Sequence, residues 1–311
     1  QGQAELLERS VLTNNGKRMT GDSLFYDRNR GIGEAFQNVE FVDTISKNML
    51  TGDYCFYNQL TGYAFATDKA VATDFSQGDS LFIHADTLQL YTFHVNTDSV
   101  YREARAYHKV RFYRTDIQGV CDSLVFSSKD SCLTLYQDPI LWNGKQQLLG
   151  EEIMVYMNDS TIDWAHIQNQ ALSVEQLDSL NYNQVSGKDM KAYFEGGEMK
   201  QVDVDGSVRL VYFPMEKDST LLGMNCSETS KLSMFLENRK LKKMAMSPKS
   251  NGTLYPMTQI PPAKMKLDNF AWFDYVRPLN KADIFNWRGK GAGQELKKST
   301  RGAAPLPNQK L

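Results

Sequence analysis

Apolar residues recur along this chain in short alternating runs, and each run follows a small or turn-forming residue. In the segment Gly21-Asp22-Ser23-Leu24-Phe25-Tyr26-Asp27, apolar residues stand three and five positions after the glycine. Side chains two positions apart lie on the same face of a β-strand, so this spacing predicts a strand that leaves a turn with Leu24 and Tyr26 on one face.

The pattern returns along most of the chain, which predicts a repetitive architecture. Seven copies are present, and their three key positions are Gly21/Leu24/Tyr26, Gly52/Cys55/Tyr57, Ala85/Leu88/Leu90, Cys121/Leu124/Phe126, Gly150/Ile153/Val155, Gly187/Met190/Ala192 and, more weakly, Thr229/Leu232/Met234. The differences between successive first positions are 29 to 42 residues. Periods of this size are typical of arrays in which each unit packs on its neighbours.

Each copy continues through a polar turn into a second strand. In the first full unit, Asp27 to Gly31 predicts the turn, and Glu34 to Phe41 predicts a returning strand with a bend at Asn38. The later run Ala104 to Tyr113 alternates in the same way, with Arg111 expected to face water. The segment Ser173 to Leu180 predicts a short helix or an excursion between units. The chain is therefore predicted to be all-β over residues 1–260.

The two ends of the chain depart from the repeat. Leu6 to Thr13 reads as the second half of a unit, and the chain lacks an initiator Met, so we expect a processed form or a fragment with further repeats upstream. Residues 261–288 are rich in aromatic side chains and predict a short cap folded over the final turn, since the open end of a strand array needs cover. Residues 289–311, rich in Gly, Lys and Pro, predict a disordered basic tail.

Composition narrows the class of function. Hydrophobic residues make up 41% of the chain, and the balance of 35 basic and 37 acidic residues argues against a nucleic-acid partner. The sequence contains no apolar run of the roughly 20 residues that a membrane helix needs.

Candidate chemistry is sparse. His84, His94, His108 and His166 are scattered and fit no metal-binding spacing, and the motifs of phosphate loops and nucleophile elbows are missing from the sequence. Asp-Ser and Asp-Thr pairs such as Asp178-Ser179 are interpreted as turn-forming dipeptides. We therefore predict no catalytic residues, no metal site and no cofactor.

The four cysteines favour buried free thiols. None forms a C-x-x-C pair, and Cys55 and Cys121 occupy repeat positions. A bridge between Cys121 and Cys132 stays open as an alternative.

The repeated apolar positions predict one wall along the array, faced by a second wall from the returning strands. Its members are Leu24, Tyr26, Tyr57, Leu88, Leu90, Leu124, Phe126, Ile153, Val155, Met190, Leu232 and Met234. Two interpretations follow from the residues alone: a closed hydrophobic core, or a groove left open between two sheets.

The repeat resembles the OstA-like (LptA) family of lipopolysaccharide-transport proteins, which includes the N-terminal domain of LptD. The likeness covers most of residues 11–287. It rests on the segments Gly21 to Asp27, Gly33 to Val39, Tyr63 to Asp68 and Ala85 to Leu88, and on Arg277-Pro278 with Asp283-Ile284-Phe285 near the end.

The resemblance implies an elongated β-jellyroll, also called a β-taco, in which two facing sheets stack like a solenoid around a V-shaped groove. It implies that the twelve wall residues are the path of lipopolysaccharide acyl chains. It further implies a non-enzymatic periplasmic protein, associated with the outer membrane, whose edge strands stack head to tail on other transport proteins or on itself. The alternative is a structural or adhesive β-solenoid with a closed core that binds glycans through exposed aromatics.

Overall fold

The computed structural model of this chain describes residues 2–14, 16–45, 47–76, 78–95, 97–158, 161–216, 218, 220–238 and 240–290. Strands account for 65% of the described residues. Within these residues there is no α-helix, and helical structure is limited to four single-turn 3₁₀ helices near the C-terminal end. The prediction of an all-β protein is confirmed.

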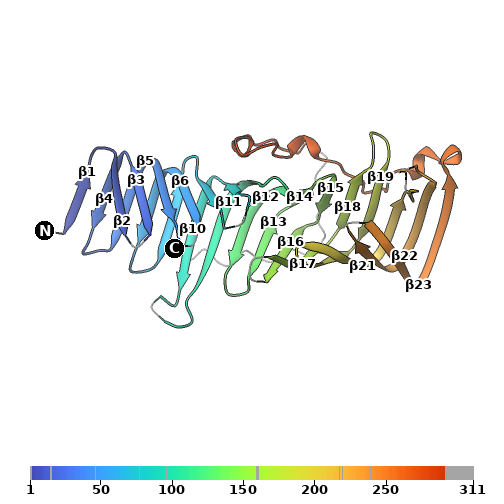
Figure 1. Cartoon of the computed structure of the whole chain (residues 1–311), viewed down its shortest axis with the longest axis horizontal. Coiled ribbons are helices and arrows are strands. Elements are labelled where there is room, and N and C mark those ends of the chain that lie inside the picture. Colours follow the sequence, from blue (N-terminus) through green and yellow to red (C-terminus); the bar gives the residue numbers. More distant parts are fainter. Residues whose placement is uncertain are drawn as a thin grey trace.

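The strands follow one another along a single long axis, and every pairing is antiparallel (Figure 1). Two series of strands run side by side, which we call arm 1 and arm 2. Arm 1 alone contains β1 (Gln3–Leu6), β4 (Ser23–Asp27), β7 (Tyr63–Thr67), β10 (Thr87–Phe93), β13 (Cys132–Tyr136), β16 (Glu152–Asn158), β17 (Thr161–Gln168) and β20 (Asp189–Glu195). Arm 2 alone contains β2 (Ser10–Asn14), β3 (Lys17–Gly21), β8 (Val71–Asp74), β9 (Leu81–His84), β14 (Ile140–Asn143), β15 (Gln146–Leu149), β18 (Ala171–Gln176) and β19 (Tyr182–Gly187).

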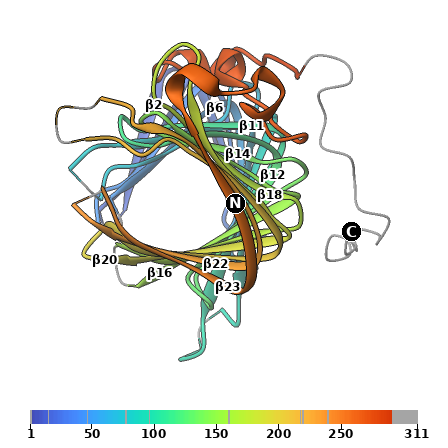
Figure 2. The same ribbon diagram turned by 90° about the vertical axis from the view of Figure 1, so that its right-hand side faces the viewer.

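Seven longer strands belong to both arms. They are β5 (Ile32–Asp43), β6 (Asn48–Asn58), β11 (Tyr101–Tyr113), β12 (Gln118–Ser127), β21 (Glu198–Tyr212), β22 (Gly223–Glu237) and β23 (Lys240–Pro256). In β5, for example, Phe36 pairs with β4 of arm 1 whereas Glu40 pairs with β3 of arm 2. The view along the long axis shows the arms as two curved layers that meet along one side (Figure 2).

The chain passes between the arms along one line, which we call the corner. Pairs of residues with left-handed backbone lie along it. The pairs are Gln37/Asn38, Asp68/Lys69, His108/Lys109, Gln137/Asp138, Asn169/Gln170 and Gly206/Ser207, with φ between 50° and 83°. Such φ values are uncommon for residues other than glycine, with Asn and Asp the most tolerant. The bend predicted at Asn38 is therefore confirmed, and the same bend recurs along the array.

We call each passage of the chain from one arm to the other a crossing. Crossings with a left-handed pair alternate with crossings without one, and the first position of each sequence repeat lies on the latter, at or beside the corner. A Cβ on Gly52 would lie 2.9 Å from the carbonyl oxygen of Thr67, and one on Gly150 would lie 2.6 Å from Cγ2 of Ile167. The residue after the small one donates its N–H to a carbonyl of the left-handed pair, as Asp53 does to Asp68 at 2.7 Å. A small residue recurs at the first repeat position because atoms of the neighbouring crossing lie too close to leave room for a larger side chain.

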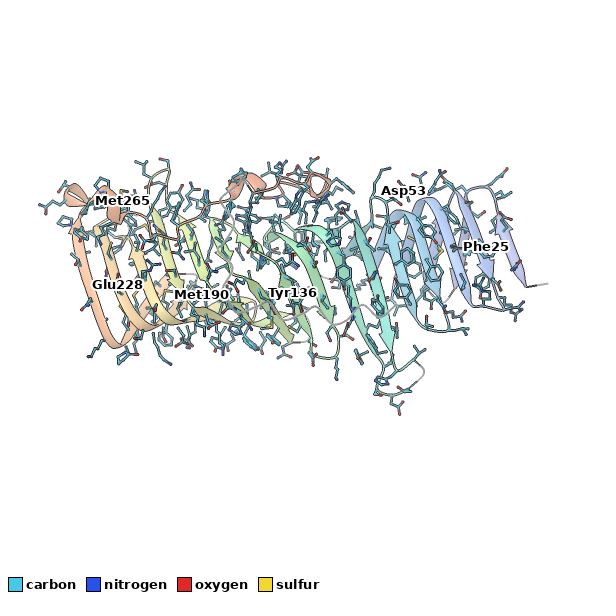
Figure 3. All side chains as sticks on the ribbon, turned by 180° about the vertical axis from the view of Figure 1, so that it is seen from behind. Phe25, Asp53, Tyr136, Met190, Glu228 and Met265 are labelled. Carbon is cyan, nitrogen blue, oxygen red and sulfur yellow. The ribbon has the colours of Figure 1, made fainter. Side chains whose placement is uncertain are left out.

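After β23 the chain turns back along the outer face of arm 2 through η1 (Met257–Gln259), η2 (Pro262–Lys264), η3 (Asp274–Val276) and η4 (Asp283–Phe285). Met265 lies on this segment, above the strands (Figure 3). Phe273 and Val276 are buried against side chains of arm 2, namely Val120, Ile140, Trp142, Leu149, Leu172 and Val174. The predicted cap over the final turn is therefore wrong in its placement: the aromatic segment covers a flank of the array, where arm 2 presents an apolar outer face.

Two buried glutamines hold this C-terminal segment by its backbone. Gln147 donates to the carbonyl of Ala271 at 2.9 Å and accepts from the N–H of Phe273 at 2.8 Å. Gln184 makes the same pair of bonds with Met265 at 2.7 Å and Leu267 at 2.9 Å. Both glutamine residues are 0% exposed. Each side-chain amide therefore satisfies one donor and one acceptor of a segment that has no strand partner.

Two further expectations are wrong, and a third falls mainly on residues that the structure does not describe. Arg111, expected to face water, is 3% exposed, because its guanidinium donates to the carbonyl of Ile284 and lies under Trp287. Half of the segment Ser173 to Leu180, expected to be a helix or an excursion, belongs to β18, and Asp178 accepts the N–H of Leu180 in the turn that follows. The predicted tail lies outside the described residues beyond Lys290.

We predict that Gln147→Ala lowers the free energy of unfolding by about 2–4 kcal/mol, because it leaves the partly buried carbonyl of Ala271 and the buried N–H of Phe273 without partners. Urea unfolding followed by circular dichroism measures the change. The matched control is the neighbouring Gln146→Ala, which removes one half-buried bond to Ser173 and is expected to cost about 1 kcal/mol or less. Equal losses in the two variants would contradict this account of how the segment is held.

Candidate functional site

Cross-strand registers place one side chain from each strand of arm 1 after β1 in a row beside the corner, on the face turned toward arm 2. This vertex row consists of Leu24, Ala35, Cys55, Ala66, Leu88, Ala106, Leu124, Leu135, Ile153, Ile167, Met190, Val204, Leu232 and Met246. From Leu24 to Leu232 every member is at most 7% exposed. Every member is apolar, so the row forms the continuous floor between the arms.

A second row runs parallel to the vertex row, two residues farther from the corner. This open row consists of Tyr26, Gly33, Tyr57, Ala64, Leu90, Ala104, Phe126, Leu133, Val155, Ala165, Ala192, Val202, Met234 and Met244. Tyr57 is 40% exposed and Leu90 is 36% exposed although both lie on the inner face. The opposite arm therefore leaves this part of the row accessible to solvent.

The middle of the open row is more closed than its N-terminal part. Val155, Ala165, Ala192 and Val202 are 8%, 7%, 3% and 5% exposed. Farther toward the C-terminal end, Met234 and Met244 are again only partly buried. The inner face thus stays apolar along the whole array while its accessibility varies.

All twelve residues predicted from the repeat lie in these two rows. Leu24, Leu88, Leu124, Ile153, Met190 and Leu232 belong to the vertex row, and Tyr26, Tyr57, Leu90, Phe126, Val155 and Met234 belong to the open row. The alternation of apolar and polar residues in a strand that follows a turn was sufficient to find them. Their role as contacts for a lipid stays a prediction.

The returning strands do not form a separate facing wall as predicted. The first part of β5, with Ala35, completes the two rows of arm 1, and its second part, with Phe41, belongs to arm 2. The inner row of arm 2 was missed in the sequence and consists of Met19, Phe41, Leu50, Ala72, Ile83, Phe112, Gly119, Leu141, Leu148, Ser173, Val185 and Leu210. The length of the returning strands was the signal, because one strand has to bend to serve both arms.

Beyond its inner row, arm 2 carries polar side chains at its outer margin. Asn143, Gln146, Glu175 and Asn183 are cross-strand neighbours from β14 to β19. The amide of Asn183 donates to Glu175 at 2.9 Å, and that of Gln146 donates to Ser173 at 3.0 Å. The inner surface therefore combines apolar rows near the corner with hydrogen-bonding groups at the margin of arm 2.

Burial shifts the pKa of the titratable groups near the rows. Burial raises the pKa of the Cys55 thiol to about 12 and also raises the pKa of Cys121. His84 lies 2.7 Å from the carbonyl oxygen of Ala70 through Nδ1, and burial lowers its pKa. Burial also lowers the pKa of His166, which faces Asp189.

All four cysteines are free, and the alternative of a bridge between Cys121 and Cys132 is excluded, since Cys121 pairs with Val110 and Cys132 with Ser127. Across the described ranges, no group of three or more His, Cys, Asp or Glu side chains is arranged to hold a metal ion.

Comparison with known proteins adds no relative: no family model matches the chain, and no curated protein matches its sequence. In the part of the chain that the structure describes, no helix is long and apolar enough to cross a membrane. The geometry of the two arms is therefore the basis for inferring the function.

We predict that Cys55 and Cys121 resist thiol reagents in the native protein at mildly alkaline pH, because burial suppresses the reactive thiolate. Cys132 and Cys226 are less buried, so we expect them to react first. Mass spectrometry after timed labelling with iodoacetamide, with and without urea, identifies the modified sites. Rapid native labelling of Cys55 would show that the floor beside the corner opens in solution.

Proposed function

We propose that this protein is a non-enzymatic, OstA-like carrier that shields the acyl chains of lipopolysaccharide between its two arms during transport across the periplasm to the outer membrane. In this proposal the architecture is the elongated β-jellyroll of that family. One observation carries it: two unbroken apolar rows run along arm 1, and Tyr57 and Leu90 of the open row remain 40% and 36% exposed.

The energetics of a lipid tail support a surface of this kind. Exposing an acyl chain of about a dozen methylenes costs on the order of 10 kcal/mol, at about 0.8 kcal/mol per CH₂. A carrier has to keep the chain covered at every stage of transfer. A row that offers a similar apolar contact on each strand provides many near-equivalent positions, so a chain can advance without leaving cover.

The apolar rows and the polar margin of arm 2 together fit an amphiphile. The acyl chains would lie on the vertex row and the open row of arm 1. The sugar groups would lie toward the margin of arm 2, where the amides of Asn143 and Gln146 offer donors and acceptors and Glu175 accepts from hydroxyls. Such a division would keep the polar part of the lipid hydrated while its tails are shielded.

The terminal strands suggest how the carrier would join partners. In the described residues, β1 pairs only with β4, β2 pairs only with β3, and β23 pairs only with β22. Each leaves one strand edge able to accept a further strand. We propose head-to-tail stacking on other lipopolysaccharide-transport proteins, or on a second copy, through these edges.

A structural β-array with a closed core is the second candidate. The burial of Val155, Ala165, Ala192 and Val202 favours it for the middle of the array. The two candidates differ in whether an acyl chain can enter between the arms, and this can be tested directly.

Photocrosslinking in cells tests the proposal. A photoreactive residue replaces Tyr57, Leu90 or Phe126 on the inner face, with Val125 as the control because it neighbours Phe126 on the opposite face of β12. We expect adducts with lipopolysaccharide at the three inner positions only. Absence of adducts in a folded periplasmic protein, or equal adducts at Val125, would favour the closed structural array.

We further predict that Phe126→Gln weakens binding of a fluorescent fatty acid about tenfold, because the amide loses its water when a lipid chain covers it. Val125→Gln places the same group on the outer face and is expected to leave affinity unchanged. Displacement titrations on the purified protein measure both, and thermal unfolding checks that the variants are folded. Equal affinities in the two variants would argue against a path along the open row.

A further inference from the structure

A series of aromatic rings lies on the outer face of arm 1, opposite the two apolar rows. Neighbouring centroids are 5.1 Å apart from Phe36 to Tyr54, 5.5 Å from Tyr54 to Phe65, 5.9 Å from Phe65 to Tyr63, 4.9 Å from Tyr63 to Tyr91 and 6.3 Å from Tyr91 to Phe93. We call these six residues the aromatic band. It crosses β5, β6, β7 and β10, so its rings are carried by paired strands rather than by loops.

The band is accessible to solvent. Phe36 is 39% exposed, and the other five rings are partly exposed. None of the six belongs to the three buried hydrophobic clusters. The C-terminal segment covers the outer face of arm 2 instead. Contiguous exposed aromatic surface of this kind is typical of a binding face.

Polar groups are fixed beside the centre of the band. The guanidinium of Arg105 lies 4.5 Å from the ring centroid of Tyr91 and donates through Nε at 3.1 Å and Nη2 at 2.5 Å to Glu103. The hydroxyl of Tyr91 donates to Gln89 at 3.1 Å. The side chains of Arg105 and Glu103 are only 15% and 21% exposed, so their ion pair is held in a fixed position next to the Tyr91 ring.

The charge of the face narrows the class of ligand. Outward positions of arm 1 on β5, β6, β7, β10 and β11 carry two carboxylates, Glu34 and Glu103, against the single guanidinium of Arg105, which is already paired with Glu103. A polyanion or an anionic lipid surface would be repelled. A ligand with apolar C–H faces and uncharged hydroxyls matches both parts of the site, because hydroxyls accept from Arg105 and donate to Glu103 and Gln89.

We propose that the aromatic band is a binding face for an extended chain of uncharged sugars, with Tyr91 at its centre. Sugar rings would stack on the aromatic faces, and their hydroxyls would bond to Glu103, Arg105 and Gln89. The inference is independent of the proposed lipid path, since it uses the opposite face of the same strands.

Affinity electrophoresis of the purified protein tests this proposal. Native gels contain dextran, laminarin, glycogen or hydroxyethyl cellulose as neutral probes. We expect retardation in at least one of them, an affinity about tenfold weaker for Tyr91→Ala, and unchanged retardation for Tyr91→Phe, which keeps the ring. The control Tyr193→Ala removes an outward ring of arm 1 that is 37% exposed and lies outside the band, and it is expected to behave as the unmodified chain.

Two further measurements keep the test decisive. Circular dichroism shows whether Tyr91→Ala is folded, and if it is not, Arg105→Gln takes its place and is expected to weaken retardation while leaving the rings intact. Retardation in none of the gels would overturn the proposal. So would retardation unaffected by these variants, or sugar-independent dimerisation or binding to phosphatidylcholine vesicles that Tyr91→Ala abolishes.

Discussion

The corner is the constraint on which the rest of this structure depends. At every second crossing from β5 to β21 the chain adopts two left-handed residues in succession, as at Gln37 and Asn38, and the crossings between them carry a small residue such as Gly52. Left-handed backbone is costly for residues with a Cβ. The cost is offset because the bent strand pairs in both arms and buries the vertex row beside the bend.

Because every crossing bends at the same place, the two arms stay in register along the whole array. The open row follows from this register: a side chain two residues from the corner in one strand lies beside its counterpart in the next. Each added strand contributes one more apolar side chain to the open row, packed beside the one on the preceding strand. The apolar surface therefore grows with the number of strands. A path for a long flexible chain requires such a repeated apolar contact. The same repetition makes the free energy of unfolding approximately a sum over neighbouring units.

The two arms nevertheless have different surroundings. Arm 2 is covered on its outer face by the C-terminal segment, whose backbone is held by Gln147 and Gln184. Arm 1 keeps an outer face with exposed aromatic rings, among them Phe36 and Tyr193. One layer of strands can therefore present an apolar inner face and a separate outer face, because alternate residues of a strand point to opposite sides.

The sequence by itself determined the all-β class, the repeat and the twelve apolar positions of arm 1, because a turn followed by alternation is a local signal with a period of two residues. Only the tertiary structure decided which arm each half of a returning strand joins, since the bend at the corner depends on contacts with the neighbouring crossings. The same holds for Arg111 and for the aromatic segment after Pro261: both lie on arm 2 because of long-range packing, which no spacing within the segment encodes.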